Sequence, residues 1–192
     1  ESDARLTAAE IGTAHHAFMQ FVDLRRTTTE LDLRNEAARL EREGILTPVQ
    51  AAALDFAGLA AFWQSELGRQ ICACPVSEVN REMPFTARFQ IVEVAELLPP
   101  EKTTSKASIK AEDDFVVVQG IADLVVLRAA EIWLVDFKTD HVAPGELAAK
   151  VQHYEPQLKV YALALSRIYR RKVTICGLHF LAARETAYVW PP

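Results

Sequence analysis

The sequence predicts an α/β fold in which a mixed β-sheet packs against helices. The first third of the chain has apolar residues at helical spacing, and the part from about residue 76 is rich in Val, Ile, Phe and Trp. A further helical stretch then precedes two short strands, which is the element order of an α/β or α+β sandwich. At 192 residues the chain has the size of one domain. We expect a helical layer over residues 1–75 and the sheet with its helices over 76–192.

The helical layer is predicted from three stretches. They read IGTAHHAFMQFVDL, ELDLRNEAARLEREGI and TPVQAAALDFAGLAAFWQSELGRQI. Thr47 followed by Pro48 predicts a helix start, because Thr accepts hydrogen bonds from free N–H groups and Pro fits the first turn. Gly44 predicts the end of the preceding helix.

The sheet is predicted to begin near residue 78. Its strands read VNREMPFTARFQIVEVAELL, FVVVQGIADLVVL and EIWLVDF, followed after a helix by KVTICGLHFL and ETAYVW. Residues 99–114 are polar and lack periodicity, which predicts an exposed loop. The helix after HVAPGE is predicted to have a second part that starts at Pro156.

Composition excludes several classes of protein. No apolar run approaches the length of a membrane span and the start lacks a signal-peptide pattern, so we expect no membrane partner and a cytoplasmic location. The three cysteines form no CxxC pair, so no iron–sulfur or zinc cluster is expected. The net charge of −5 counts against binding nucleic acid over the whole surface, although a local basic groove or a partner domain could supply that grip. Since the chain lacks an initiator Met, we expect a piece of a longer polypeptide.

Two aspartates interrupt the most apolar strands. Residues 120–128 and 131–137 can form an antiparallel hairpin that turns at the two alanines between them, with partners whose numbers add up to 259. In that register Asp123 lies opposite Asp136. Directly opposed residues have β-carbons about 5 Å apart, and like charges so placed destabilise a sheet.

A divalent cation between the two aspartates would remove this repulsion. Strand alternation predicts that Asp123 shares a face with Ile121, Val125 and Leu127, while Asp136 and Lys138 share theirs with Ile132 and Leu134. The charges thus continue apolar stripes, which favours a metal site over a solvated strand end. Two carboxylates suit Mg²⁺ or Mn²⁺, and Lys138 beside them can orient a water and stabilise charge on a phosphoryl oxygen. The pattern predicts phosphodiester hydrolysis.

The motifs GIAD, DFKTD and YxxQLxxYAxAL resemble the nuclease domain of the RecB and AddA branch of the PD-(D/E)XK superfamily. The first Asp of that family falls on Asp123, here preceded by Ala instead of Pro, and its D/E-x-K falls on Asp136 and Lys138. The resemblance implies a restriction-endonuclease-like core, with a central mixed sheet flanked by helices and an N-terminal helical layer.

Three further stretches extend the resemblance over most of the chain. GTAHH is similar to the GTxxH helix, which implies His16 instead of His15 as a metal ligand beside Asp123 and Asp136. REMPF resembles an acidic E-x-P-F element and implies a supporting or water-binding role for Glu82, whose alternative is a solvated strand face. In YEPQLKVYALAL the resemblance implies that Gln157 and Tyr161 position substrate, near a helix start at Pro156 that suits a phosphate.

The resemblance implies a Mg²⁺- or Mn²⁺-dependent DNA exonuclease that leaves 3′-hydroxyl and 5′-phosphate ends. It implies single strands delivered by a helicase of the same polypeptide, an AddB-like partner subunit, and processing of double-strand breaks for recombinational repair. It implies no iron–sulfur cluster, since the four cysteines of the AddB type are missing. No GxxxxGK[ST] motif is present, so the motor lies outside these residues.

Two alternatives stay open. One is a freestanding nuclease of the same superfamily, which would need its own grip on DNA. The other is a non-catalytic module that binds DNA or a partner. Thr139 and Asp140 complete the DFKTD motif, but the sequence assigns them no role.

Overall fold

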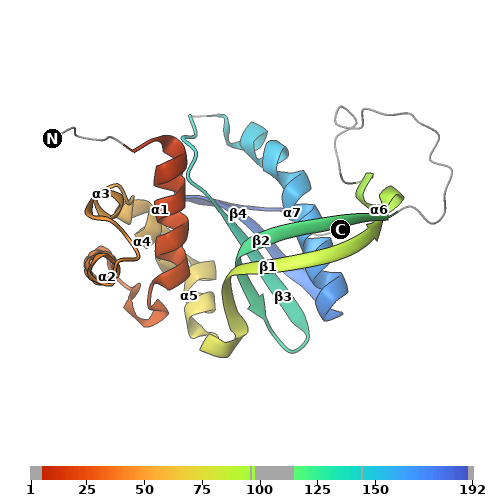
Figure 1. The fold of residues 1–192 in the computed structure, drawn as a ribbon, viewed down its shortest axis with the longest axis horizontal. Helices are drawn as coiled ribbons and strands as arrows, with labels where there is room; N and C mark the ends of the chain where they lie inside the picture. Colours follow the sequence, from red (N-terminus) through yellow and green to blue (C-terminus); the bar gives the residue numbers. More distant parts are fainter. Residues whose placement is uncertain (1–5, 96, 98–114, 144, 190–192) are drawn as a thin grey trace.

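A five-stranded sheet with helices on both faces forms the core of the computed structural model, which describes residues 6–95, 97, 115–143 and 145–189 (Figure 1). The strand order is β1-β2-β3-β4-β5, where β3 and β4 run parallel and the other neighbours are antiparallel. The strands are β1 (Val79–Gln90), β2 (Phe115–Leu127), β3 (Glu131–Lys138), β4 (Lys172–Phe180) and β5 (Glu185–Tyr188). The prediction of an α/β fold with a mixed sheet is confirmed.

Five of the described α-helices precede the sheet in the sequence and two follow β1. The helices are α1 (Ala8–Phe21), α2 (Glu30–Arg42), α3 (Pro48–Ala52), α4 (Phe56–Gln64), α5 (Glu66–Ala73), α6 (Ile91–Ala95) and α7 (Leu147–Tyr169), with the 3-10 turns η1 (Leu24–Arg26) and η2 (Val76–Glu78). As predicted, Thr47 caps α3 and Pro48 is its first residue. Gly44 follows α2 with φ of 73°.

The sheet lies between two hydrophobic cores. One core joins the helical layer to the sheet and includes Phe18, Phe62 and Val135. The other lies between the sheet and α7 and includes Leu134 and Leu158. Because alternate residues of β3 enter opposite cores, nearly the whole strand is buried, and Asp136 sits within it.

The predicted β2–β3 register is confirmed. The four recorded pairs run from Leu124 opposite Val135 to Leu127 opposite Ile132, and the partners' numbers add up to 259 in each. The Arg128 N–H closes the turn by donating to the Glu131 carbonyl at 3.0 Å.

Two details of the prediction differ from the structure. The first strand ends at Gln90 and continues as α6. The helix start predicted at Pro156 is wrong, since α7 runs unbroken through this residue. Proline removes one helical hydrogen bond, but Val151 before it and Leu158 after it pack in the same core and keep the helix in place. The loop predicted over residues 99–114 lies outside the described residues.

The alternation of side chains along β1 and β2 is interrupted at Glu82 and Asp123, so that each face of the pair changes the core it packs against. We call this the exchange of faces. Leu124 and Val126 lie in the core with the helical layer, whereas Ala122 lies in the core with α7, although strict alternation would place all three on one face. Glu82 has φ of 48° in β1, which is a rare value for a residue with a side chain.

Because of this exchange, one of the predicted strand faces is wrong. Ile121 was expected to share a face with Asp123 and Val125, but Ile121 is 53% exposed while Val125 is fully buried against α7. The expectation is wrong because it assumed unbroken alternation along β2. Beyond the exchange, β1 and β2 continue as a two-stranded ribbon that α7 covers on one face.

A glycine permits the close contact between this ribbon and α7. A β-carbon on Gly120 would lie 2.7 Å from Phe85 Cζ and 2.9 Å from Tyr161 Cζ. We expect Gly120→Val to lower the free energy of unfolding by about 1–3 kcal/mol, because the rings must move apart. Urea denaturation measures the change. Gln119→Val, at the adjacent exposed position, is the control and should stay within about 0.5 kcal/mol of the parent. Equal midpoints for the two variants would contradict this packing.

Candidate functional site

His16, Glu82 and Asp123 meet where α1, β1 and β2 converge. His16 Nδ1 lies 3.1 Å from Glu82 Oε1 and 3.5 Å from Asp123 Oδ1. One ligand atom from each side chain lies within 4.8 Å of the others, and all three residues are partly buried. A group of one imidazole and two carboxylates at this spacing could hold a metal ion.

The two neighbouring histidines of α1 have different surroundings. His15 is buried, and its Nε2 accepts a hydrogen bond from the Asp55 N–H at 2.9 Å. Its Nδ1 therefore carries the proton and donates to the Ile11 carbonyl at 2.8 Å. Burial lowers the pKa of His15, so this imidazole is a neutral structural group. The structure brings His16, and not His15, to the carboxylates.

Glu82 belongs to this group because of its backbone conformation. Its neighbours Arg81 and Met83 pair with Leu124 and Ala122, so Glu82 lies at the level of Asp123 on the adjacent strand. The left-handed φ at Glu82 interrupts the pairing there and accompanies the approach of its carboxylate to His16. The sequence predicted only a supporting role for this residue, and the motif carried no signal of its unusual conformation.

Asp123 is the electrostatic centre of the site. Its side chain is 10% exposed, and Oδ2 accepts a hydrogen bond from the Phe137 N–H at 2.7 Å. Burial, and next the charge of Asp136, raise the pKa of Asp123 to about 7, against the lowering effects of His16 and the Phe137 N–H. The effect of Asp136 shows that the two predicted aspartates interact. A bound cation would favour the ionised form of both.

Asp136 and Lys138 form a buried ion pair on β3. Lys138 Nζ lies 2.8 Å from Asp136 Oδ2, and Asp136 is 5% exposed. This ion pair is the contact of Oδ2, and no other donor reaches that atom among the described residues. Asp136 lies outside the compact group of His16, Glu82 and Asp123. The predicted residues thus form two adjoining parts, a three-residue group and an ion pair.

Tyr154 and Asp140 support Lys138, which the sequence did not predict. The Lys138 ammonium lies 4.2 Å from the centre of the Tyr154 ring. Tyr154 donates its hydroxyl to Asp140 at 2.8 Å, and Lys150 donates to the same carboxylate at 3.2 Å. Burial alone would raise the pKa of Asp140, but these hydrogen bonds lower it. The available signals were the Asp of DFKTD and the first Tyr of the YxxQ motif.

Thr139 lies against α1. A β-carbon on Gly12 would come within 3.2 Å of Thr139 Oγ1. The glycine of GTAHH therefore lets the helix that carries His16 approach the end of β3.

Tyr161 packs between α7 and the ribbon, and the exposed Gln157 lies one helical turn before it. The Tyr161 ring packs edge-on against Phe85 with centroids 4.8 Å apart, and Gln157 Nε2 donates to the Tyr161 hydroxyl at 3.1 Å. Among the described residues, no hydrogen bond or ion pair joins either side chain to His16, Glu82 or Asp123. Because α7 does not begin at Pro156, the phosphate site expected at a helix N-terminus there is also wrong.

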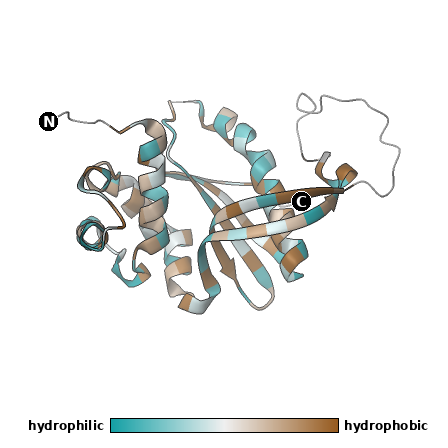
Figure 2. Cartoon of the chain, viewed as in Figure 1, coloured by the Kyte–Doolittle hydropathy of each residue, from teal (hydrophilic) through white to brown (hydrophobic). Residues whose placement is uncertain are grey.

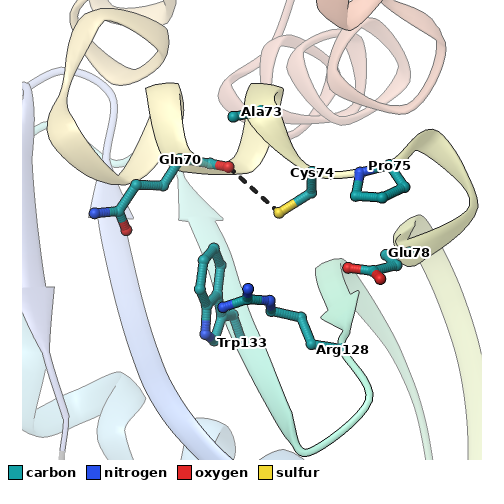
Figure 3. Close-up of a pocket in the computed structure, with 7 residues that line it drawn as sticks. All are labelled: Gln70, Ala73, Cys74, Pro75, Glu78, Arg128 and Trp133. Atoms are coloured by element: carbon teal, nitrogen blue, oxygen red, sulfur yellow. Dashed lines mark hydrogen bonds between the residues drawn. The ribbon is translucent and has the colours of Figure 1, made fainter.

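A surface pocket of about 470 Å³ lies between α5, η2 and the β2–β3 turn (Figure 3). The Arg128 guanidinium stands 4.8 Å from the Trp133 ring centre, and the Cys74 thiol donates to the Gln70 carbonyl at 3.3 Å. None of the predicted site residues lines this pocket.

A family model described as the PD-(D/E)XK nuclease superfamily matches residues 1–187. The chain belongs to the PD-(D/E)XK nuclease superfamily. This confirms the resemblance found in the GIAD and DFKTD motifs and identifies the protein as a nuclease. In this PD-(D/E)XK chain no described helix has the length and apolar character needed to cross a membrane.

Curated relatives of this PD-(D/E)XK chain are named as subunits of an ATP-dependent helicase/nuclease. The chain is similar to that protein of Moorella thermoacetica, with 36% identity over 94% of this chain and 12% of the relative. The protein of Listeria innocua is 34% identical over 96% of this chain, and that of Geobacillus kaustophilus is 35% identical over 91%. The chain spans 12–14% of the length of these relatives.

The raised pKa of Asp123 predicts how the metal-free nuclease responds to pH. Because the folded pKa, about 7, exceeds the ordinary value of 3.8, the proton stabilises the fold, and this contribution disappears as pH rises through about 7. From pH 5.5 to pH 8 the parent should lose about 1–2 kcal/mol of unfolding free energy more than Asp123→Asn, which cannot ionise. Urea denaturation in EDTA measures both. Parallel pH dependences would show that Asp123 ionises normally.

Proposed function

We propose that the chain is the nuclease domain of an AddA-like helicase-nuclease and hydrolyses DNA phosphodiester bonds with Mg²⁺ or Mn²⁺. The observation that carries the proposal is the meeting of His16, Glu82 and Asp123 beside the Asp136–Lys138 ion pair. In this proposal residues 1–192 act as one domain, with the helical layer positioning His16 and the sheet positioning the aspartates and Lys138.

His16, Asp123 and Asp136 are the proposed metal ligands, and the position of Glu82 adds it as a fourth candidate. The set is rich in carboxylate oxygen with one imidazole, which suits Mg²⁺ or Mn²⁺. The raised pKa of Asp123 fits a cation in this position. When bound, the ion would supply an activated water and stabilise charge on the phosphoryl group.

Lys138 is the proposed catalytic cation. Its ammonium is held between the Asp136 carboxylate and the Tyr154 ring, and its side chain is 15% exposed. From there it can donate a hydrogen bond to the attacking water and stabilise the negative charge that develops on the phosphoryl oxygens. The water releases a proton to solvent and its oxygen forms a bond to phosphorus as the bond to the 3′-oxygen breaks. The leaving oxygen takes up a proton, which yields 3′-hydroxyl and 5′-phosphate ends.

The names of the relatives support the wider setting. They are helicase/nuclease subunits of which this chain matches 12–14%. We therefore propose a helicase in the same polypeptide that delivers single strands, digestion as an exonuclease, and an AddB-like partner subunit. We further propose that this helicase-nuclease acts in the cytoplasm and processes double-strand breaks for recombinational repair. In this setting Gln157 and Tyr161 are proposed to position substrate from α7, where Tyr161 also packs on Phe85 of the ribbon.

Cleavage of end-labelled single-stranded DNA with Mg²⁺ or Mn²⁺ tests the proposed chemistry. Lys138→Ala and Asp136→Ala should each lower the rate on the order of 100-fold or more, since each removes a charge at the reacting group. Lys159→Ala, which removes an α7 lysine paired with Glu155, is the matched control and should cut at the parental rate. Extension of the products by a template-independent polymerase that needs a 3′-hydroxyl checks that cleavage leaves 3′-hydroxyl ends.

Titration with Mn²⁺ accompanies the assay. A parent that neither binds Mn²⁺ nor cuts would favour a non-catalytic module, whereas Mn²⁺ binding that disappears in Asp136→Ala would exclude such a module. Cutting that survives both substitutions would exclude the proposed roles of Asp136 and Lys138.

A further inference from the structure

The outer ribbon has one exposed face for which the nuclease site alone gives no explanation. We define the outer ribbon as residues 83–90 of β1 and 115–122 of β2, which pair antiparallel beyond the exchange of faces. Its α7 face buries Phe85 and Phe89. Its other face consists of Pro84, Thr86, Arg88 and Gln90 of β1 with Phe115, Val117, Gln119 and Ile121 of β2. Figure 1 shows the ribbon reaching past the other strands.

This face is apolar along β2. Phe115 and Val117 are each 51% exposed and Ile121 is 53% exposed, although strands normally turn polar side chains toward water. Figure 2 shows hydrophobic residues along this part of β2. Ile121 lies opposite Pro84, so the apolar surface continues onto β1 at the end near the site. A row of this kind on a soluble protein indicates a binding surface.

The charge on the face favours a polyanion. Arg88 is its one cation and none of its eight residues carries a carboxylate, in a chain of net charge −5. The Arg88 guanidinium lies 3.6 Å from the centre of the Phe115 ring. Arg34 and Arg167 pair with carboxylates, whereas Arg88, like the exposed Arg42 and Arg69, has no carboxylate partner among the described residues. A guanidinium can donate two parallel N–H groups to a phosphate.

The face leads directly to the metal-binding group. Pro84 and Ile121 lie two residues from Glu82 and Asp123, at the inner end of the ribbon. With a rise of about 3.3 Å per residue, the face extends about 20 Å from Ile121 to Phe115. A strand whose phosphate reaches Asp123 can therefore continue along it.

We propose that the exposed face of the outer ribbon binds the bases of single-stranded DNA that enters or leaves the metal site. This inference rests on the proposed nuclease function. The Phe115 ring can stack on a base of any sequence, the aliphatic side chains can pack against neighbouring bases, and the arginine can contact the backbone. Aromatic stacking beside a basic group is how sequence-independent single-strand binders work. Duplex DNA keeps its bases stacked inside the helix, so the apolar row selects single strands.

Fluorescence anisotropy with two labelled strands tests the proposal. The 192-residue chain carrying Lys138→Ala, which blocks cleavage, is titrated in Mg²⁺ into an oligothymidylate and into an abasic strand of equal length. We expect tighter binding of the oligothymidylate. Adding Phe115→Ser with Val117→Ser should weaken this binding about tenfold or more and leave the abasic strand little changed. Arg88→Gln should weaken the binding of both strands.

Leu31→Ser with Val49→Ser is the matched control, because these residues are 66% and 52% exposed on α2 and α3. The control should bind like its parent. Equal affinity of the parent for the two strands, or ribbon variants that bind like the control, would overturn the inference and favour a protein partner for this face.

The proposed function is tested separately by the cleavage assay with Lys138 intact. If the parent cuts DNA but the ribbon substitutions do not alter binding, only the ribbon inference fails. If the parent neither binds metal nor cuts, the proposed function fails and the ribbon inference fails with it.

Discussion

Two aspartates on neighbouring strands, one buried and one partly buried, impose the main constraint on this structure. Asp123 and Asp136 lie in a sheet covered on both faces, and burial together with their mutual repulsion raises the pKa of Asp123 to about 7. The surrounding groups offset this cost in different ways: Lys138 pairs with Asp136, the Phe137 N–H donates to Asp123, and the His16 ring lies beside Asp123. These contacts are only partial compensation, which is why the site is suited to a cation.

The exchange of strand faces connects the site to the ribbon. The left-handed backbone at Glu82 lies at the level of Asp123, where both strands change the core that their side chains enter. On the inner side, this arrangement brings the Glu82 carboxylate to His16. On the outer side, it leaves Ile121 and the alternate residues beyond it exposed. One local backbone feature thus accounts for the third member of the metal-binding group and for the exposed face.

Features that depend only on residues close together in the sequence could be predicted. The β2–β3 register followed from a two-residue turn and strict pairing, and the α3 cap followed from Thr47 and Pro48, since both depend on nearby residues. The conformation of Glu82 could not be predicted, because tertiary contacts hold a residue with a side chain in a rare region of φ. Helix α7 continues past Pro156 because core packing outweighs one lost hydrogen bond. The support of Lys138 by Tyr154 and Asp140 depends on how α7 docks, which no motif encodes.

The decisive measurement is the position of Mn²⁺ in crystals of this chain, located by its anomalous scattering. The proposed ligand set predicts a peak within about 2.5 Å of a carboxylate oxygen of Asp123, with Asp136 and His16 among the other ligands. A peak bound by neither aspartate, or an empty site in crystals that bind Mn²⁺ elsewhere, would contradict the view that the buried carboxylates exist to hold a catalytic cation.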